Sequence, residues 1–268
     1  MKQDHKYTRR YGQVFLSDKN IASLEVRALD LPAGSHILEI GPGGGILTGI
    51  LLDSGYRVTA VESDHRFVEN LAIRFRNEIQ EGRLRVVKED FLEFEPGQYD
   101  GIMGNVPYQI SSPILFRLES FGFRAAVLMF QEEFAQRLLA GPGDKSYSRI
   151  SVNAQLRYVI KSIRNVPRTC FTPAPKVNSR IIRITPRPDA NLGDLRKADP
   201  IFRDIFSKRR KKLSSILDGL PGEIGEKRVD DFTPAELLDI ARRYFNGKTS
   251  PSQDLPLPGS PCPVWTLH

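Results

Sequence analysis

Short apolar runs alternate with amphipathic segments along most of the chain. The apolar runs have the length of buried strands, and the segments between them repeat apolar residues at helical spacing. Asp18 is placed to cap one such helix and Gly55 to end another. The apolar runs predict strands at residues 36–41, 56–63, 84–90, 99–105, 124–131, 157–166 and 180–186. Strands that alternate with helices through short connections predict an α/β fold with a parallel sheet wrapped by helices.

The alternation stops at residues 186–194, a stretch rich in Pro, Gly and Asp. Beyond it, residues 200–217 and 233–245 have helical periodicity, which predicts a small C-terminal helical domain. We therefore expect an α/β domain at residues 1–187, including a basic N-terminal arm, and a helical domain at residues 188–246. Residues 247–268 are rich in Pro, Ser and Gly and are expected to be a disordered tail.

Composition narrows the class of protein. The chain has 268 residues, of which 40% are hydrophobic, so it has enough apolar side chains for a sizeable core. No apolar run approaches the roughly 20 residues that cross a bilayer, and we expect no membrane partner. The two cysteines, Cys170 and Cys262, lack metal-type spacing, which argues against a disulfide scaffold or a zinc site and predicts no metal. An intracellular, cytoplasmic protein is expected.

Positive charge is in excess and is concentrated in two places. The net charge is +7 and the isoelectric point about 9.4, values that favour a nucleic-acid partner as much as simple solubility. Five consecutive cations at 208–212 would surround one helix turn, too many for i,i+4 pairing, so phosphate contact is favoured over a solvated face. The expected RNA-binding residues are Arg9, Arg10, Lys208, Arg209, Arg210, Lys211 and Lys212.

A glycine-rich loop, EIGPGGG at residues 39–45, follows the first strand of the α/β pattern and precedes a helix. Glycines let the backbone approach a ligand, and a helix N-terminus offers free N–H groups. Glu62 ends the next strand, where a carboxylate accepts hydrogen bonds from both ribose hydroxyls. This placement predicts a nucleoside site. A tight turn without ligand and a dinucleotide oxidoreductase are the alternatives, although Pro42 removes an N–H that a pyrophosphate would use.

Two further strands end at the same predicted edge of the sheet. Asp90 can accept from an exocyclic amine and Phe91 can cover a base, or the two are a helix cap and a core side chain. Asn105-Val106-Pro107-Tyr108 suits methylation of an adenine N6 amine, whose lone pair is delocalised into the ring. The Asn105 side-chain oxygen and the Val106 carbonyl, held by Pro107, would accept its two hydrogens, and Tyr108 would stack on the base. An Asx-turn with a buried tyrosine is the alternative.

The NVPY segment resembles the Asn-x-Pro-Tyr motif of S-adenosylmethionine-dependent adenine-N6 methyltransferases. Three longer segments, GQVFLSDKN, FQEEFAQRLLAGPGDKSYSRISV and FTPAPKVNS, resemble the rRNA adenine dimethyltransferases, in the right order over about residues 9–245. NVPYQISSP and AGPGDKSYSR are closer to the small-subunit enzymes of the archaeal and eukaryotic-like branch. Val14 and Val106 depart from the family pattern.

The resemblance implies a Rossmann-like class I methyltransferase sheet of seven strands, with the last strand antiparallel, and S-adenosylmethionine as cofactor. It also implies that Phe171, on the stiff loop FTPAP, faces the target base opposite Tyr108; a core-filling phenylalanine is the alternative. The expected cofactor-binding residues are Gln13, Val14, Leu16, Glu39, Gly41, Gly43, Glu62, Asp90, Phe91 and Asn105, and the expected catalytic residues are Asn105, Val106, Pro107, Tyr108 and Phe171.

The family implies dimethylation of two adjacent adenosines near the 3′ end of small-subunit rRNA. The expected partner is an immature small ribosomal subunit, and we expect the chain to act as a monomer. Three other functions remain open from the sequence. They are methylation of a large-subunit adenosine with macrolide resistance, a ribosome-assembly factor that acts mainly by binding, and DNA adenine methylation. The last is less favoured, because the sequence shows no separate target-recognition domain.

Overall fold

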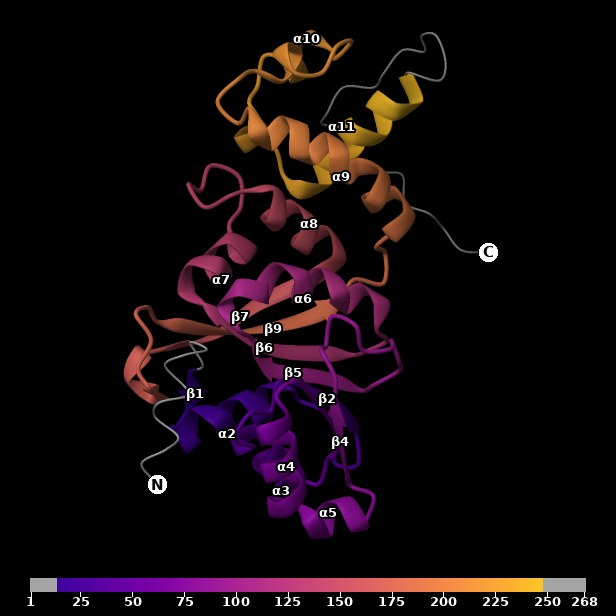
Figure 1. Cartoon of the computed structure of the whole chain (residues 1–268). Coiled ribbons are helices and arrows are strands. Elements are labelled where there is room, and N and C mark those ends of the chain that lie inside the picture. Colours follow the sequence, from indigo (N-terminus) through magenta and orange to yellow (C-terminus); the bar gives the residue numbers. More distant parts are fainter. Residues whose placement is uncertain (1–13, 248–268) are drawn as a thin grey trace.

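A computed structural model describes residues 14–247 of the chain, and its centre is a seven-stranded sheet (Figure 1). The strand order is β4-β3-β2-β5-β6-β9-β7, and β9 alone runs antiparallel, to both β6 and β7. The strands are β2 (His36–Ile40), β3 (Arg57–Glu62), β4 (Leu84–Lys88), β5 (Gly101–Asn105), β6 (Ala125–Gln131), β7 (Tyr158–Val166) and β9 (Ser179–Pro186). The predicted α/β fold with a sheet of seven mostly parallel strands is confirmed.

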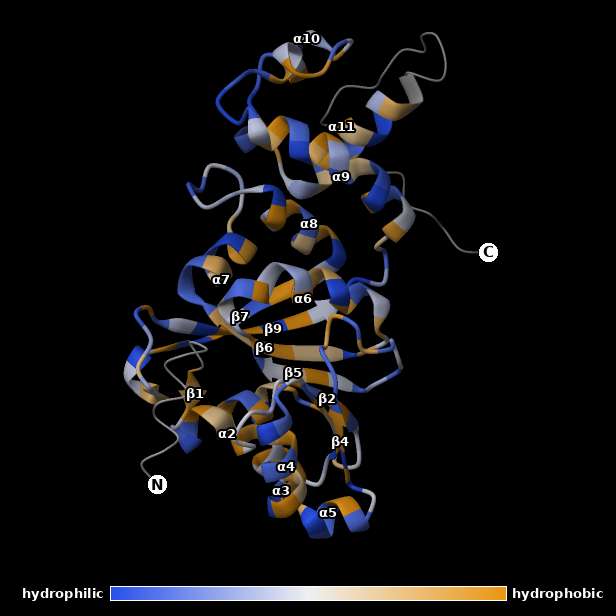
Figure 2. Cartoon of the chain, in the orientation of Figure 1, coloured by the Kyte–Doolittle hydropathy of each residue, from blue (hydrophilic) through white to orange (hydrophobic). Residues whose placement is uncertain are grey.

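Helices cover both faces of the sheet, because successive strand residues point to opposite sides. Ile37 of β2 joins the apolar cluster under one helical layer, and the next residue, Leu38, joins the cluster under the other. Figure 2 shows apolar residues on the strands and a mixture of apolar and polar residues on the helices that cover them. The first layer contains α2 (Lys19–Ala28), α3 (Ile46–Asp53), α4 (His65–Arg74) and α5 (Arg76–Gln80), and the second contains α6 (Ser111–Arg117), α7 (Glu132–Leu139) and α8 (Arg149–Arg157).

The C-terminal part is helical and lies beyond α8 (Figure 1). It contains α9 (Leu192–Ser207), the short α10 (Gly222–Gly225) and α11 (Pro234–Gly247). These helices share a third apolar cluster with Tyr147 and Val152, and the buried Tyr147 hydroxyl donates to the Phe232 carbonyl at 3.0 Å. The helical part therefore packs directly on the α7–α8 side of the α/β part. A boundary near residue 187 stays a prediction, and the arm at residues 1–13 and the tail at 248–268 lie outside the described residues.

The predicted helix over residues 200–217 is wrong at both ends. The helix α9 begins at Leu192, runs through Pro200 and ends at Ser207, so the cations at 208–212 follow the helix and do not surround a helix turn. Tertiary contacts hold them in an irregular path. The Arg209 guanidinium donates to Asp230 at 2.7 Å and to the carbonyls of Asp144 and Lys145 at 2.8 and 2.9 Å. Such contacts outweigh helix propensity, which is a weak preference.

Within residues 14–247, no helix is both long and apolar enough to cross a bilayer.

Gly104 in β5 is required by the close approach of two strands. A Cβ at this position would lie 2.6 Å from the Ile40 carbonyl oxygen and 3.0 Å from the Ile40 Cβ. Because the clash is with backbone in the middle of the sheet, we expect Gly104→Ala to lower the free energy of unfolding by about 2–3 kcal/mol. Gly141→Ala is the matched control, since no heavy atom lies within 4 Å of its Cβ position. Urea denaturation of both variants measures the difference, and equal midpoints would contradict this packing argument.

Candidate active site

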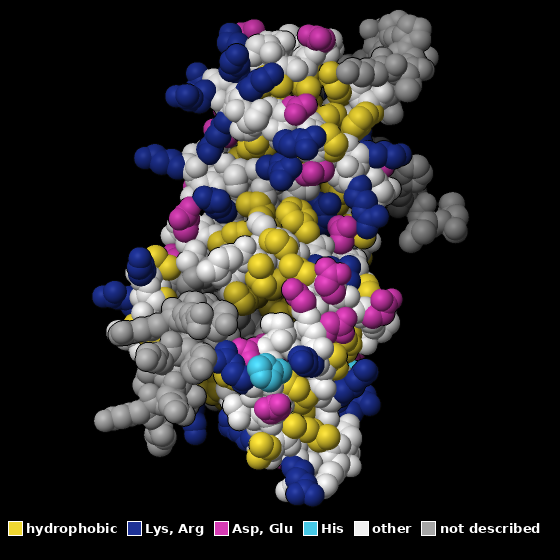
Figure 3. Space-filling model, in the orientation of Figure 1, with side chains coloured by type: hydrophobic (Ala, Val, Ile, Leu, Met, Phe, Trp, Pro, Cys, Tyr) yellow, Lys and Arg dark blue, Asp and Glu magenta, His cyan; other side chains and the backbone are white. Residues whose placement is uncertain are grey.

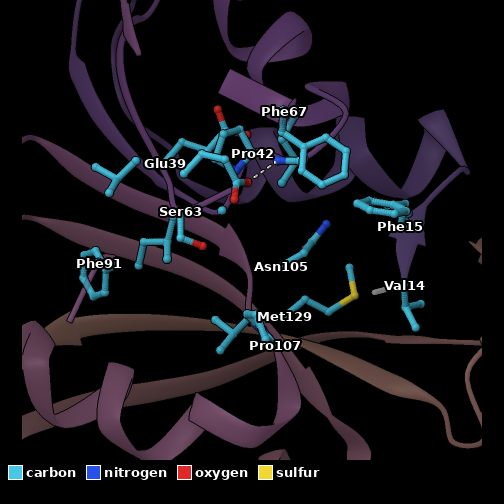
Figure 4. Close-up of a pocket in the computed structure, with 18 of the residues that line it drawn as sticks. Val14, Phe15, Glu39, Pro42, Ser63, Phe67, Phe91, Asn105, Pro107 and Met129 are labelled. Carbon is cyan, nitrogen blue, oxygen red and sulfur yellow. Dashed lines mark hydrogen bonds between the residues drawn. The ribbon is translucent and has the colours of Figure 1, made fainter. Parts of the chain in front are cut away.

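A cavity of about 370 Å³ opens at the carboxyl ends of β2, β3, β5 and β6 (Figure 4). Ligands of doubly wound sheets bind at this edge, where the strand ends and the following loops converge. Nearly all the residues that the sequence singled out for cofactor binding or catalysis line it. They are Val14, Leu16, Glu39, Gly41, Gly43, Glu62, Asp90, Phe91, Asn105, Val106, Pro107 and Phe171. Gln13 lies outside the described residues, as does the side chain of Tyr108.

The glycine loop forms one wall of the cavity. Gly41 and Gly43 have φ angles of +63° and +51°, a region that favours glycine, and the loop leads into α3 at Ile46. A Cβ on Gly43 would lie 3.0 Å from the Phe15 ring, so glycine also permits the N-terminal segment to close over the loop. The Gly43 N–H donates to a Glu62 carboxylate oxygen at 3.0 Å, which joins the loop to the end of β3.

Glu62 is held rigidly with its carboxylate in the cavity wall. Its second oxygen accepts from the Asp64 N–H at 2.9 Å, and the side chain is only 8% exposed. Each carboxylate oxygen has two lone pairs, so each can still accept from a hydroxyl. A fixed carboxylate beside an open glycine loop fits the ribose of a nucleoside cofactor.

Glu39 is a second carboxyl in the same wall and is buried. Its Oε2 accepts from the Thr48 hydroxyl at 2.7 Å, whereas Oε1 has no hydrogen-bond partner among the described residues. Burial raises the pKa of Glu39 to about 7, against the opposing effect of the Thr48 hydrogen bonds and with a smaller contribution from the negative charge of Glu62. The unpartnered acceptor at a cavity wall fits a cofactor group that donates a hydrogen bond.

Asp90 and Phe91 lie on the loop after β4, where the structure shows the cap and the core side chain, while contact with a cofactor stays a prediction. Asp90 is exposed, and its Oδ1 accepts from the Leu92 N–H at 2.9 Å as a turn-capping residue, while it also borders the cavity. Phe91 is buried and stacks on Phe121 with ring centroids 5.3 Å apart, yet it also lines the cavity. Both positions are compatible with contact to the adenine end of a cofactor.

The Asn-x-Pro-Tyr segment follows β5 directly. Asn105 pairs with Met129 of β6, and the Val106 N–H donates to the Met129 carbonyl at 3.1 Å. Figure 4 shows the Asn105 side chain pointing into the cavity. Its Oδ1 has no hydrogen-bond partner within residues 14–247, and no N–H of that part donates to the Val106 carbonyl. Two acceptors at the carboxyl end of β5 are thus without a partner among the described residues. Tyr108 begins a 3₁₀ turn, η1 (Tyr108–Ile110).

The segment before α2 closes the cavity from the other side. β1 (Phe15–Leu16) pairs antiparallel with β8 (Phe171–Thr172), in register Leu16 with Phe171. This pairing brings residues more than 150 positions apart in the chain to the same cavity. Phe171 is 6% exposed and belongs to the apolar core as well as to the cavity lining, so it fills the core, and its contact with the target base stays a prediction.

Phe15, Phe67 and Met129 are among the lining side chains that sequence reasoning did not find. Phe15 and Phe67 meet edge to face with ring centroids 5.3 Å apart. Met129 is the residue of β6 that pairs with Asn105 of β5. Phe15 lies between Val14 and Leu16, which were predicted to bind the cofactor. The segment GQVFLSDKN that contains all three is therefore the signal that could have identified Phe15. Met129 is identified only by the pairing of β5 with β6.

The fold and the site together define a class. The class is an adenine-N6 methyltransferase of the Rossmann-like type. Three features define it: a sheet with one antiparallel strand, a glycine loop joined to a carboxylate on the next strand, and an Asn-x-Pro-Tyr segment in the same cavity.

Comparison with known proteins agrees with this class. A family model described as ribosomal RNA adenine dimethylase matches residues 4–242. "Probable ribosomal RNA small subunit methyltransferase A" of Methanospirillum hungatei is 39% identical over 219 residues, which are 81% of this chain and 85% of that protein. A dimethyladenosine transferase structure from Plasmodium falciparum matches with a TM-score of 0.78 and 30% identity, covering 88% of this chain and 98% of that one. The 23S rRNA methyltransferase ErmE matches with a TM-score of 0.66 and 26% identity, covering 86% and 99%.

The chain belongs to the ribosomal RNA adenine dimethylase family. It is therefore an S-adenosylmethionine-dependent rRNA adenine dimethyltransferase, as the sequence motifs predicted.

Proposed function

We propose that this chain dimethylates N6 of two adjacent adenosines near the 3′ end of small-subunit rRNA, during assembly of the subunit. The observation that carries the proposal is the pair of unengaged acceptors, Asn105 Oδ1 and the Val106 carbonyl, in the same cavity as the Gly43–Glu62 cradle. Relatives named as small-subunit enzymes favour the small subunit over the large one.

The two acceptors address the weak nucleophilicity of the adenine amine. When the amine hydrogens are held by Asn105 Oδ1 and the Val106 carbonyl, N6 moves toward tetrahedral geometry and its lone pair localises. When bound, S-adenosylmethionine supplies an electrophilic methyl group, whose bond to sulfur breaks as its bond to N6 forms. The amine then releases one proton to water, so no strong base is required. Catalysis by these residues is positioning and electrostatic stabilisation.

The target base must leave any helical stack to reach this cavity. We assign Tyr108 and Phe171 to the two faces of the base, with Glu62 on the cofactor ribose and Asp90 at its adenine end. Phe171 is supported by its place in the lining. Stacking of a base on an aromatic ring contributes about 1–3 kcal/mol, enough to offset much of the unstacking.

Positive side chains of the C-terminal part supply the contact with rRNA phosphates in this proposal. Figure 3 shows Lys and Arg side chains spread over the upper, helical part of the molecule. A monomer in the cytoplasm that acts on an immature small subunit is the form in which we expect the enzyme to work.

The experiment that tests the proposal uses radiolabelled S-adenosylmethionine with three substrates in parallel. These are small subunits lacking the modification, large subunits and duplex DNA, each followed by nucleoside analysis. Dimethyladenosine in the small subunit alone supports the proposal. Label only in the large subunit would assign the chain to the resistance-type enzymes. Label in duplex DNA would favour DNA adenine methylation. Cofactor binding without any label would favour an assembly factor that acts by binding.

The basic segment offers a second test, because its cations differ in their partners. Arg209 and Lys212 form ion pairs with Asp230 and Glu226, whereas Lys208, Arg210 and Lys211 have no acidic partner within residues 14–247. Replacing these three with glutamine is expected to weaken rRNA binding and to reduce the slope of log K against log [salt] by about 2, since each phosphate contact contributes about 0.7. Fluorescence anisotropy over a salt series measures the slope.

The matched control for this charge removal is the double variant Arg209→Gln, Lys212→Gln. Its salt slope is expected to change by less than about 1, because both charges are already neutralised by carboxylates. Equal slopes for the triple variant and the unmodified chain would show that the segment does not contact phosphates.

A further inference from the structure

A second cavity, of about 430 Å³, lies beside the active site, and the mechanism above does not use it. We call it the side groove. The beginning of α7 forms one wall, and η3 (Arg168–Cys170) together with the loop before β9 forms the other. The lining residues are Gln131, Glu132, Glu133, Gln136, Arg168, Lys176, Val177 and Asn178. Most of these residues are exposed, so the side groove is open to molecules from solution.

The side groove meets the active-site cavity where β6 ends and β9 begins. Gln131 is the last residue of β6 and pairs with Ser179, which lines the active-site cavity. Asn178, the residue before Ser179, joins the two walls of the side groove. Its carbonyl accepts from the Glu132 N–H at 3.0 Å, and its Oδ1 accepts from the Arg168 N–H at 3.1 Å. Because consecutive Cα atoms are about 3.8 Å apart and stacked nucleotides about 3.4 Å apart, an RNA strand whose target base enters the cavity reaches the side groove within about two nucleotides.

The two carboxylates of the side groove are neutralised by arginines. Glu132 Oε2 accepts from the Arg180 guanidinium at 3.2 Å, and the Glu133 carboxylate forms an ion pair with Arg137 at 2.6 Å. Gln136 donates a further hydrogen bond to Glu132 at 3.1 Å. Neither carboxylate is therefore left as a free negative charge that would repel a phosphate.

The two cations of the side groove are without such partners. Neither Arg168 nor Lys176 has an acidic partner within residues 14–247, and both are exposed. The side groove therefore carries an excess of positive charge. A guanidinium and an ammonium both donate to phosphate oxygens, so this charge pattern favours the backbone of a nucleic acid.

The rest of the lining suits a nucleobase. Val177 is 43% exposed and is the one large apolar side chain of the lining, so it offers a small surface against which a base can pack. The Gln131 side chain and Asn178 Nδ2 make no hydrogen bond within residues 14–247, so both can bond to the edge of a base. A protein partner typically contacts a larger apolar centre that contains aromatic side chains, so the lining favours RNA over protein.

We propose that the side groove binds a nucleotide that flanks the target adenosine. Arg168 and Lys176 contact its phosphate. Val177 packs against its base, while the Gln131 and Asn178 amides bond to the base edge. The inference rests on methyl transfer to an rRNA adenosine in the active-site cavity, whichever subunit supplies that adenosine. A flanking nucleotide held in this way anchors the strand while the target base is out of the stack.

Removing both cations tests the side groove directly. For the double variant Arg168→Gln, Lys176→Gln we expect the KM for immature small subunits to rise at least about tenfold, because two charge-assisted contacts are lost. The kcat should stay within about twofold, since a contact made equally in the ground state and the transition state changes KM alone. The melting temperature and the dissociation constant of S-adenosylmethionine should not change, because both side chains are exposed and without an acidic partner.

The salt dependence of RNA binding is a readout that a merely structural role would not change. Loss of two phosphate contacts should reduce the slope of log K against log [salt] by about 1.4, at about 0.7 for each contact with a single strand. Fluorescence anisotropy with a labelled single-stranded oligoribonucleotide of about ten nucleotides measures this slope without any need for methyl transfer.

The matched control is the double variant Arg76→Gln, Arg85→Gln. Both residues are exposed cations, in α5 and β4, and three strands separate β4 from β6 in the sheet. The same charge is lost at a distance from the side groove, so the KM should stay within about twofold and the slope should change by less than about 0.5. Equal effects in the two double variants would show an effect of net charge and would overturn the inference.

The outcomes separate this inference from the proposed function. If the unmodified chain labels no RNA but the Arg168, Lys176 variant loses affinity for the oligoribonucleotide, the proposed function fails and the side groove stands as an RNA site. If label appears and that variant keeps its KM and its slope, the side groove is wrong and the function stands. Loss of affinity for assembled subunits alone, with affinity for the oligoribonucleotide unchanged, would assign the side groove to a protein contact and overturn the inference.

Discussion

Replacing Asn105 with alanine is expected to lower the rate of methyl transfer to rRNA about 10²–10³-fold, the effect typical of removing one preorganised hydrogen-bonding group from a transition state. The reason is that Asn105 Oδ1 has no hydrogen-bond partner within residues 14–247, and in the proposed mechanism it accepts from the substrate amine. Without it, only the Val106 carbonyl holds the amine, and N6 stays closer to planar.

Single-turnover kinetics with saturating cofactor and immature small subunits measure this effect on the chemical step. Gln109→Ala is the matched control, since Gln109 also borders the cavity but is exposed and has no role in the mechanism. Its rate should stay within about threefold of the unmodified chain. Full activity of Asn105→Ala would remove the catalytic assignment, and equal losses in both variants would indicate damage to the cavity as a whole.

Replacing Glu62 with alanine is expected to weaken S-adenosylmethionine binding at least about 100-fold. A hydrogen bond to a charged group contributes about 1.5–3 kcal/mol, and two ribose hydroxyls would lose their acceptor. The substitution also leaves the Gly43 and Asp64 N–H groups without the carboxylate that now accepts from both, so the glycine loop loses its tie to β3. Binding and loop order should therefore fall together.

Isothermal titration calorimetry well below the melting temperature gives the dissociation constant for this variant. The control is Glu69→Gln on the exposed side of α4, which removes the same charge outside the cavity and should leave the affinity within about twofold. Thermal shifts on adding cofactor provide an independent check, because a ligand that binds only the folded state stabilises it in proportion to ln(1 + [L]/Kd). An unchanged dissociation constant for Glu62→Ala would exclude it from the ribose site.

Strand positions were predictable from sequence because the sheet is buried on both faces. A run such as the one at 124–131 has apolar residues at successive positions, since β6 is covered by helices on one side and the other. The glycine loop and Glu62 were predictable for a related reason. Backbone geometry at the end of a parallel strand restricts which residues can stand there, so the motif and its position in the fold are linked.

Elements that depend on contacts between distant parts of the chain were not predictable in the same way. The cations at 208–212 have helical composition, but the ion pair of Arg209 with Asp230 and the burial of Leu213 draw the chain out of the helix. Local propensity amounts to tenths of a kcal/mol per residue, and a single buried side chain or a set of hydrogen bonds exceeds it. The roles of the individual site residues stay predictions until they are tested.

The sequence by itself determined the α/β class, the seven strands, the family and the cavity edge where the motifs meet, because each depends on local pattern or on residues adjacent in the chain. Only the tertiary structure decided that β9 lies between β6 and β7, that Phe15 and Met129 line the cavity, and that Glu25 of α2 is buried. These last facts depend on strand order and on the packing of α2 against the sheet. A glutamate on an amphipathic helix has no local feature that marks it as buried, and only the packed neighbours decide which face of the helix it occupies.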